Sequence, residues 1–155
     1  MVREPDSASD GLRTRLSLAA VAGRLLQPAV LTAVGVGGAI GALARYRMEL
    51  LLPASSRAFP VATFAVNVVG AIILGSLSAI SARRLSLTSW VRALVGVGFC
   101  GGLTTFSTMS LETAKLWGIT PLTAVGYIAV SVIAAPAAIV LGRQFGTRIF
   151  PEPSE

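Results

Sequence analysis

Four long runs of apolar residues, separated by short polar connections, dominate the chain. They lie at about 28–52, 59–82, 90–117 and 120–142. Spanning ~30 Å of hydrocarbon takes roughly 20 apolar residues in a helix, so each run is long enough to cross a membrane. The pattern predicts an all-α membrane protein whose four helices cross up-down-up-down, with both ends of the chain on one side.

Composition supports this prediction and excludes several classes of protein. Apolar residues make up 54% of the 155 residues and charged residues 13%, and the mean hydropathy of +0.75 is too high for a small soluble domain. Histidine is absent and Cys100 is the only cysteine, which excludes an intrachain disulfide and a Cys/His zinc site. An enzyme is not expected. The net charge is +6, and the basic residues lie between the apolar runs. This placement favours lipid headgroups over nucleic acid as the partner.

The two ends differ from the rest of the chain. Residues 1–27 mix acidic, basic, serine and glycine residues, and we expect a flexible N-terminal extension there. Residues 28–150 form the predicted four-helix membrane domain. Residues 151–155 are a polar tail.

Two polar side chains lie within the second, otherwise apolar run. Asn67 is near its middle, and Thr63 is four residues earlier, on the same helix face. An amide left unpaired in hydrocarbon is costly, so Asn67 needs a partner. Two interpretations stay open for this pair: hydrogen bonds between helices, or the lining of a pore.

The third run contains a weak point for a helix. Gly101 and Gly102 are followed by Thr104 and Thr105 near the predicted midplane, and this combination favours a broken helix. Non-helical backbone at this depth must be buried in protein or line a wet cavity, and carbonyls freed by a break suit a bare cation. The alternative is a continuous helix whose hydroxyls bond to the preceding turn.

Uncharged hydrogen-bond donors follow the break. Ser107 and Thr108 adjoin Phe106, whose ring has a partly positive edge, and Tyr127 and Ser131 share a face of the fourth run. Such groups could bind a small anion loosely enough to release it. Four helices are too few to enclose a pore, so we expect an oligomer.

These motifs resemble the CrcB/Fluc family of fluoride channels. The matching segments are GGAIGALARY at 37–46, FPVATFAVNVVGA at 59–71 and GFCGGLTTFST at 98–108. The resemblance implies an antiparallel dimer with two pores, passive fluoride efflux across the plasma membrane, and a structural sodium ion that is not transported.

The resemblance also implies roles for particular residues. The sodium ligands would be the backbone carbonyls of Gly101 and Thr104, and Arg45 and Glu112 would lie near a vestibule. Met109 stands where the family usually has a second pore phenylalanine. The residues implied along the fluoride path are Phe106, Met109, Asn67, Thr63, Ser107, Thr108, Tyr127 and Ser131.

Two other functions remain as alternatives. A small four-helix exporter of drugs or cations would need an acid within the membrane, and Glu49 and Glu112 lie near span ends. A structural membrane protein that transports nothing is the second alternative.

The basic residues carry information on orientation. Eight lie close to the spans on the side of the two termini, and four lie on the other side. The first set is Arg13, Arg15, Arg24, Arg83, Arg84, Arg92, Arg143 and Arg148, and the second is Arg45, Arg47, Arg57 and Lys115. This bias favours cytoplasmic termini and a paired homologous chain as the dimer partner. Without the three arginines of the extension the sides are nearly balanced, which allows a homodimer inserted in both orientations.

Overall fold

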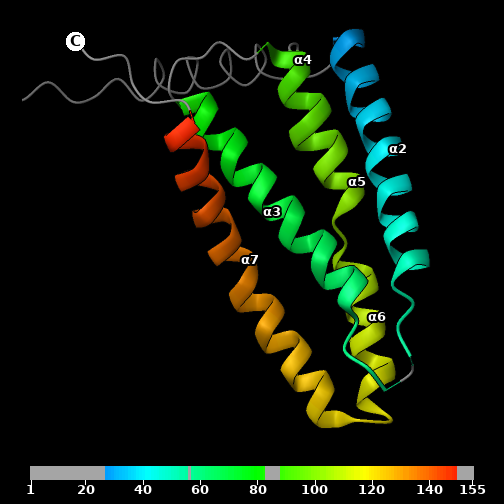
Figure 1. Cartoon of the computed structure of the whole chain (residues 1–155). Helices are drawn as coiled ribbons and strands as arrows, with labels where there is room; N and C mark the ends of the chain where they lie inside the picture. The colour runs from blue at the N-terminus through cyan, green and yellow to red at the C-terminus, as the bar shows by residue number, and fades with distance from the viewer. Residues whose placement is uncertain (1–26, 56, 83–87, 150–155) are drawn as a thin grey trace, which may run out of the picture.

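Four helical spans form the structure, a computed structural model that describes residues 27–55, 57–82 and 88–149. They are α2 (Pro28–Leu51), α3 (Val61–Ala82), a composite third span (Ser89–Trp117) and α7 (Pro121–Ile149). Each is long and apolar enough to cross a membrane, which confirms the predicted fold class. Successive spans alternate in direction, and residues 28 and 149 lie at the same end of the bundle (Figure 1). The predicted extension and polar tail fall outside the described residues, apart from Gln27.

The third span is the irregular one. It consists of α4 (Ser89–Arg92), the π-helical segment η1 (Ala93–Cys100), α5 (Gly101–Leu103) and α6 (Phe106–Trp117). Between α5 and α6 the backbone is extended, with φ/ψ of −80°/153° at Thr104 and −151°/125° at Thr105. The predicted break is therefore confirmed. It follows the glycine pair, which remains helical.

Close backbone contacts at glycines explain why the helix continues through Gly102. A methyl group on Gly102 would overlap the carbonyl oxygen of Gly38, and one on Gly41 would overlap that of Phe99. The same holds for Gly37 against Leu94. These glycines let the backbones of α2 and of η1 with α5 approach closely, which is how helices commonly pack in lipid.

The helices α3 and α7 form a second close pair. A methyl group on Gly75 would overlap the carbonyl oxygen of Ile139, and one on Gly142 would overlap that of Ile72. The hydroxyl of Ser76 donates to the carbonyls of Ile72 and Gly142, at 2.9 and 3.0 Å. α7 continues past its predicted end at residue 142, because this pairing lasts through Gly146.

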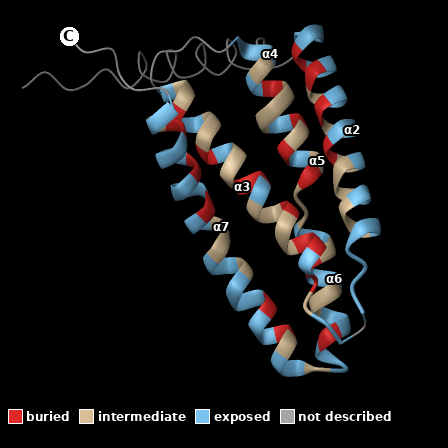
Figure 2. Ribbon diagram, viewed as in Figure 1, coloured by how far each residue is buried: buried red, intermediate tan, exposed pale blue. Residues whose placement is uncertain are grey.

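Burial follows these helix pairs. Buried residues form stripes where the helices face one another, and the outer faces are exposed (Figure 2). Large apolar side chains on those faces include Leu122, 87% exposed, and Phe106, 76% exposed. Such faces suit contact with lipid or with another membrane subunit.

Candidate functional site

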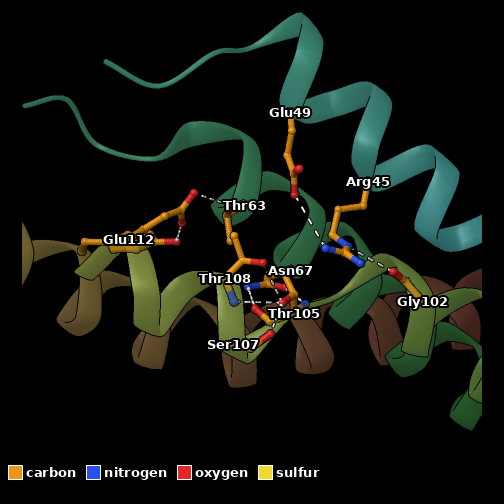
Figure 3. A network of polar contacts seen from close by, with 10 residues as sticks. Arg45, Glu49, Thr63, Asn67, Gly102, Thr105, Ser107, Thr108 and Glu112 are labelled. Atoms are coloured by element: carbon orange, nitrogen blue, oxygen red, sulfur yellow. Dashed lines mark hydrogen bonds and ion pairs between the residues drawn. The ribbon is translucent and has the colours of Figure 1, made fainter. Parts of the chain in front are cut away.

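The broken backbone of the third span is held by one side chain of α3. The backbone N–H of Thr105 donates to Oδ1 of Asn67 at 2.8 Å, and Nδ2 of Asn67 donates to the carbonyl of Thr105 at 3.1 Å (Figure 3). One amide therefore satisfies both backbone groups of a residue that has left the helix. This pairing removes the main penalty of non-helical backbone within the membrane.

Thr105 also begins α6 as its N-cap. Its Oγ1 accepts the backbone N–H of Thr108 at 3.1 Å, donates to Oγ1 of Thr108 at 3.1 Å and shares a hydrogen bond with Oγ of Ser107 at 3.2 Å. Threonine is a favoured N-cap because its oxygen takes a backbone donor that the helix leaves free. The hydroxyls of residues 105, 107 and 108 thus form one cluster at the start of α6.

A groove of about 330 Å³ lies beside the break. Its polar lining comes from Asn67, Thr104, Thr105 and Ser131, and no charged residue lines it. Oγ of Ser131 is buried without a hydrogen-bond partner among the described residues. The apolar lining consists of Phe64, Val68, Ala71, Leu74, Phe106, Met109, Val132, Ala135 and Ile139. An uncharged groove with a few hydroxyl and amide groups suits a small, weakly held ligand.

A second polar cluster lies further along α6. The carboxylate of Glu112 accepts one hydroxyl on each oxygen, from Thr63 and from Tyr127, both at 2.8 Å. Thr63 and Tyr127 are fully buried. The ring of Phe59 packs edge-on against that of Tyr127, with centroids 5.0 Å apart. This cluster joins α3, α6 and α7 at one half-buried acid.

Arg45 reaches the break from α2. Its Nε donates to the carbonyl of Gly102 at 3.2 Å, and its guanidinium lies 3.7 Å from the carboxylate of Glu49. Figure 3 shows Arg45 directed towards the break, on the opposite side of it from Glu112. The arginine therefore supplies a donor to a carbonyl at the end of α5.

Two other carbonyls at the break have lost their usual helical donors. The N–H that would serve Gly101 in a helix belongs to Thr105 and is bound to Asn67. The N–H that would serve Thr104 belongs to Thr108 and is bound to the side chain of Thr105. Gly101 is exposed, and a methyl group placed there would meet no atom within 4 Å. These carbonyl oxygens fit the type of ligand that a bare cation needs.

The predicted path residues fall into three groups. Phe106, Met109, Asn67 and Ser131 line the groove; Thr63 and Tyr127 are buried around Glu112; Ser107 and Thr108 belong to the cap cluster. Thr63 and Asn67 share a helix face, and each binds a different partner. Met109 also packs against Tyr127 and Leu116 in a buried apolar cluster.

Sequence reasoning missed the role of Thr105. It was predicted only as part of the weak segment, yet it is both the N-cap of α6 and the partner of Asn67. The available signal was a threonine placed directly before a helix, which is a common N-cap position.

The arrangement defines a class of protein: a multi-pass membrane protein with a polar break in one span, beside an uncharged groove. The chain matches the family described as CrcB-like protein, Camphor Resistance (CrcB), over residues 32–143. Since this match covers most of the chain, the protein belongs to the CrcB-like family, a family of ion channels and not of enzymes.

Relatives of this chain are similar to it over most of their length. A fluoride-specific ion channel FluC of Methanopyrus kandleri is 45% identical over 112 residues, covering 72% of this chain and 85% of the relative. The fluoride-specific ion channel FluC 1 of Mycobacterium tuberculosis is 42% identical over 123 residues, covering 76% and 93%. The fluoride-specific ion channel FluC 2 of Rhodococcus jostii is 48% identical over 110 residues, covering 70% and 91%.

Proposed function

We propose that this protein is a fluoride-specific ion channel that lets fluoride leave the cell passively across the plasma membrane. The relatives bearing that name support the ion. The observation that carries the proposal is the groove beside the break, where Phe106, Asn67 and Ser131 surround a space with no charged lining residue.

The chemistry of the groove suits an anion in transit. A fixed positive charge would hold fluoride tightly, whereas hydroxyl, amide and ring-edge donors replace part of its hydration shell with weak contacts. A negative-inside potential favours anion exit by ~2.3 kcal/mol per 100 mV. No coupled ion is needed to drive efflux.

The alternative of proton-coupled cation export is less well supported. An exporter of that kind needs an acid free to exchange a proton for its cargo. Both oxygens of Glu112 accept hydroxyl hydrogen bonds, and Glu49 lies beside Arg45. Neither acid lines the groove beside the break.

The working unit in this proposal is an antiparallel dimer. Phe106, which directly follows the non-helical backbone of the third span, is 76% exposed, and Gly101, at the start of α5, is exposed as well. Lipid cannot satisfy backbone polar groups, so a second protein surface is the suitable cover for this region. An isologous pair would place the same face of each copy in contact.

A structural sodium ion completes the proposed dimer. The carbonyl oxygens of Gly101 and Thr104, both deprived of their helical donors, would hold it together with the same pair from the second copy. When bound, the ion would neutralise converging carbonyl dipoles. The side chains of Asn67 and Thr105 maintain the backbone shape that frees these carbonyls.

We further propose that both termini lie in the cytoplasm when the orientation is fixed. The bias of basic residues towards their side supports this, and the partner would then be a paired homologous chain of opposite bias. Cysteine labelling at positions 55 and 154, in cells expressing this chain alone, separates the two cases. Equal labelling of each site from both sides would establish dual insertion and a homodimer instead.

Fluoride efflux from liposomes that contain this chain alone tests the function. We expect rapid efflux for the wild-type chain and nearly none for Phe106→Ile, which removes the ring edge from the groove. Phe145→Ile is the matched control, since Phe145 is an exposed phenylalanine of α7 outside that groove. Wild-type efflux in the Phe106 variant would remove the ring from the mechanism, and no efflux in any liposome would reject a self-sufficient channel.

Sodium is tested separately from flux. Exhaustive exchange of sodium for a large organic cation should lower the thermal stability of the purified dimer as well as its efflux rate. Indifference of both quantities to sodium would reject the proposed ion site.

A further inference from the structure

A groove lies between the last turns of α7 and the middle of α3, apart from the groove beside the break. We call it the α7 groove, and its volume is about 370 Å³. Gln144 and Arg148 provide its polar lining, and its other lining residues, Ile72 and Leu141 among them, are apolar. Close contact between Gly142 and the backbone of Ile72 places the two helices side by side here. The α7 groove is therefore apolar towards the middle of the span and polar towards the end of α7.

The two grooves open on different sides of α7. Ile139 lines the groove beside the break, and Arg148 lines the α7 groove. These residues are nine positions apart, about two and a half helical turns, so their side chains leave α7 in opposite directions. The proposed dimer contact lies at the break. The α7 groove would therefore face the lipid and not the second copy.

The polar end of the α7 groove lies at the depth of lipid headgroups. α7 has 29 residues and is ~43 Å long, whereas the hydrocarbon of a bilayer is ~30 Å thick. Arg148 is in the last turn of α7, and Gln144 is one turn before it. Both therefore belong to the part of the helix that extends past the hydrocarbon, and Leu141 and Ile72 lie nearer to it.

Arg148 offers a positive charge that no described residue neutralises. Within the described part of the chain the ion pair joins Arg45 to Glu49, and the side chains of Arg148 and Gln144 make no hydrogen bond there. Both side chains are exposed. An arginine binds a phosphate through several N–H groups at once, and an amide adds a further donor. Basic pockets between membrane helices are typical binding sites for anionic headgroups.

We propose that the α7 groove binds one anionic phospholipid, whose phosphate contacts Arg148 and Gln144 and whose acyl chain lies along Leu141 and Ile72. This inference goes beyond the proposed channel function and does not depend on it. The apolar lining favours a lipid over a free phosphate ion, because only an acyl chain would remove that surface from water. With cytoplasmic termini the lipid would belong to the inner leaflet, where anionic lipids concentrate.

The test counts the lipid molecules bound to the purified full-length protein in detergent by native mass spectrometry. Phosphatidylglycerol and phosphatidylcholine with the same acyl chains are added in turn. We expect the wild-type chain to hold one phosphatidylglycerol more tightly than phosphatidylcholine. Arg148→Gln should weaken this binding about tenfold, as for the loss of a hydrogen bond to a charged group. Gln144→Leu should weaken it less, because the amide carries no charge. Glycerol phosphate, which has the phosphate but no acyl chain, should not displace the lipid.

Arg143→Gln is the matched control, because Arg143 is an exposed arginine of the same helix that lies outside the α7 groove. It should bind phosphatidylglycerol as wild type does. Equal losses in the two arginine variants would indicate general attraction between basic residues and anionic lipid, and would overturn the site. Unchanged binding in Arg148→Gln, or wild-type binding without a preference for phosphatidylglycerol, would also overturn it.

Two further outcomes separate the proposed lipid from other roles of Arg148. Displacement by glycerol phosphate would indicate a site for a soluble anion and would overturn the lipid. A lower unfolding temperature of Arg148→Gln in lipid-free detergent would assign the arginine to the stability of the helix end, where a positive charge is favourable. That result would overturn its role as a lipid ligand, whereas an unchanged unfolding temperature together with weaker lipid binding supports it.

Discussion

The two halves of the third span are built in different ways. The first half, η1 with α5, packs its backbone against α2 through glycines, and buried Ala93 and Gly98 face α2. The second half, α6, contacts α3 and α7 through side chains, with hydroxyls and one carboxylate among them. Close backbone contact holds the first half in place, and side-chain hydrogen bonds help to hold the second.

The difference explains why the span breaks where it does. A glycine-packed helix needs a close neighbour along its length, and α2 supplies it up to Gly102. α6 instead needs its polar face directed to α3 and α7. Two extended residues change the direction of the chain between these partners, and Asn67 satisfies the polar backbone that the change exposes. Glycine packing can hold two helices together, whereas the polar half also creates a groove.

The largest loss of stability is expected for a substitution that disrupts the close backbone packing of the first half against α2. Gly102→Ala would place a methyl group against the carbonyl of Gly38, an overlap with backbone that no rotamer relieves. We expect a loss of about 3 kcal/mol in unfolding free energy, measured by thermal unfolding in detergent. Gly101→Ala is the control one residue earlier, where the methyl group meets nothing within 4 Å. Equal destabilisation by both substitutions would contradict the packing account.

The next largest loss of stability is expected where side-chain hydrogen bonds hold the break before α6. Asn67→Leu would leave both backbone groups of Thr105 without their present partners. Unpaired buried polar groups cost about 1–3 kcal/mol each, and Thr105 is only half-buried. We therefore expect the low end for both groups, a loss of about 2 kcal/mol in unfolding free energy, together with slower fluoride efflux. Val69→Leu, on the exposed face of the same helix, is the control. If the Asn67 variant unfolds at the same temperature as wild type, the amide does not hold the break.

The contrast between the halves also separates what the sequence predicts from what it does not. Span positions follow from apolar length, and the break follows from the weak helix propensity of its glycines and threonines. Its location after Gly102 depends on the contact with Gly38 of a helix about 60 residues away, which no local propensity contains. The π-helical segment η1 was not predicted either, because local propensity does not contain such contacts.

The candidate site shows a similar division. A polar side chain within an apolar run identifies Asn67 as a residue that needs a partner, with Thr63 on the same helix face. Their pairing was not predictable from spacing, since Thr63 and Asn67 share a face and yet bind different parts of the third span, Glu112 within α6 and Thr105 at the break. Which of the path residues line the groove and which lie buried beside it depends on how α3, α6 and α7 are packed together. Only the fold supplies that information.

A smaller effect is expected at the cap of α6. Thr105→Val keeps the shape of the side chain and removes the oxygen that accepts the N–H of Thr108. Loss of an N-cap costs about 1 kcal/mol, so the unfolding free energy in detergent should fall by about that amount. Thr105→Ser retains the oxygen and should remain close to wild type. A serine variant as unstable as the valine variant would assign the effect to the lost methyl group.

The smallest effect is expected for a hydroxyl placed on an intact pair of helices. Ser76 donates to carbonyls of α3 and α7, but these helices already pack through Gly75 and Gly142 and their backbone is regular. Hydrogen bonds between membrane helices average about 0.6 kcal/mol, and Ser76→Ala should cost about that much in unfolding free energy. Gly142→Ala, which brings a methyl group against the carbonyl of Ile72, should cost several times more at the same interface. A serine effect as large as that of Asn67 would show that polar bonds, and not close backbone contact, hold this pair. Polar side chains would then contribute equally to stability where the backbone is helical and where the helix is broken.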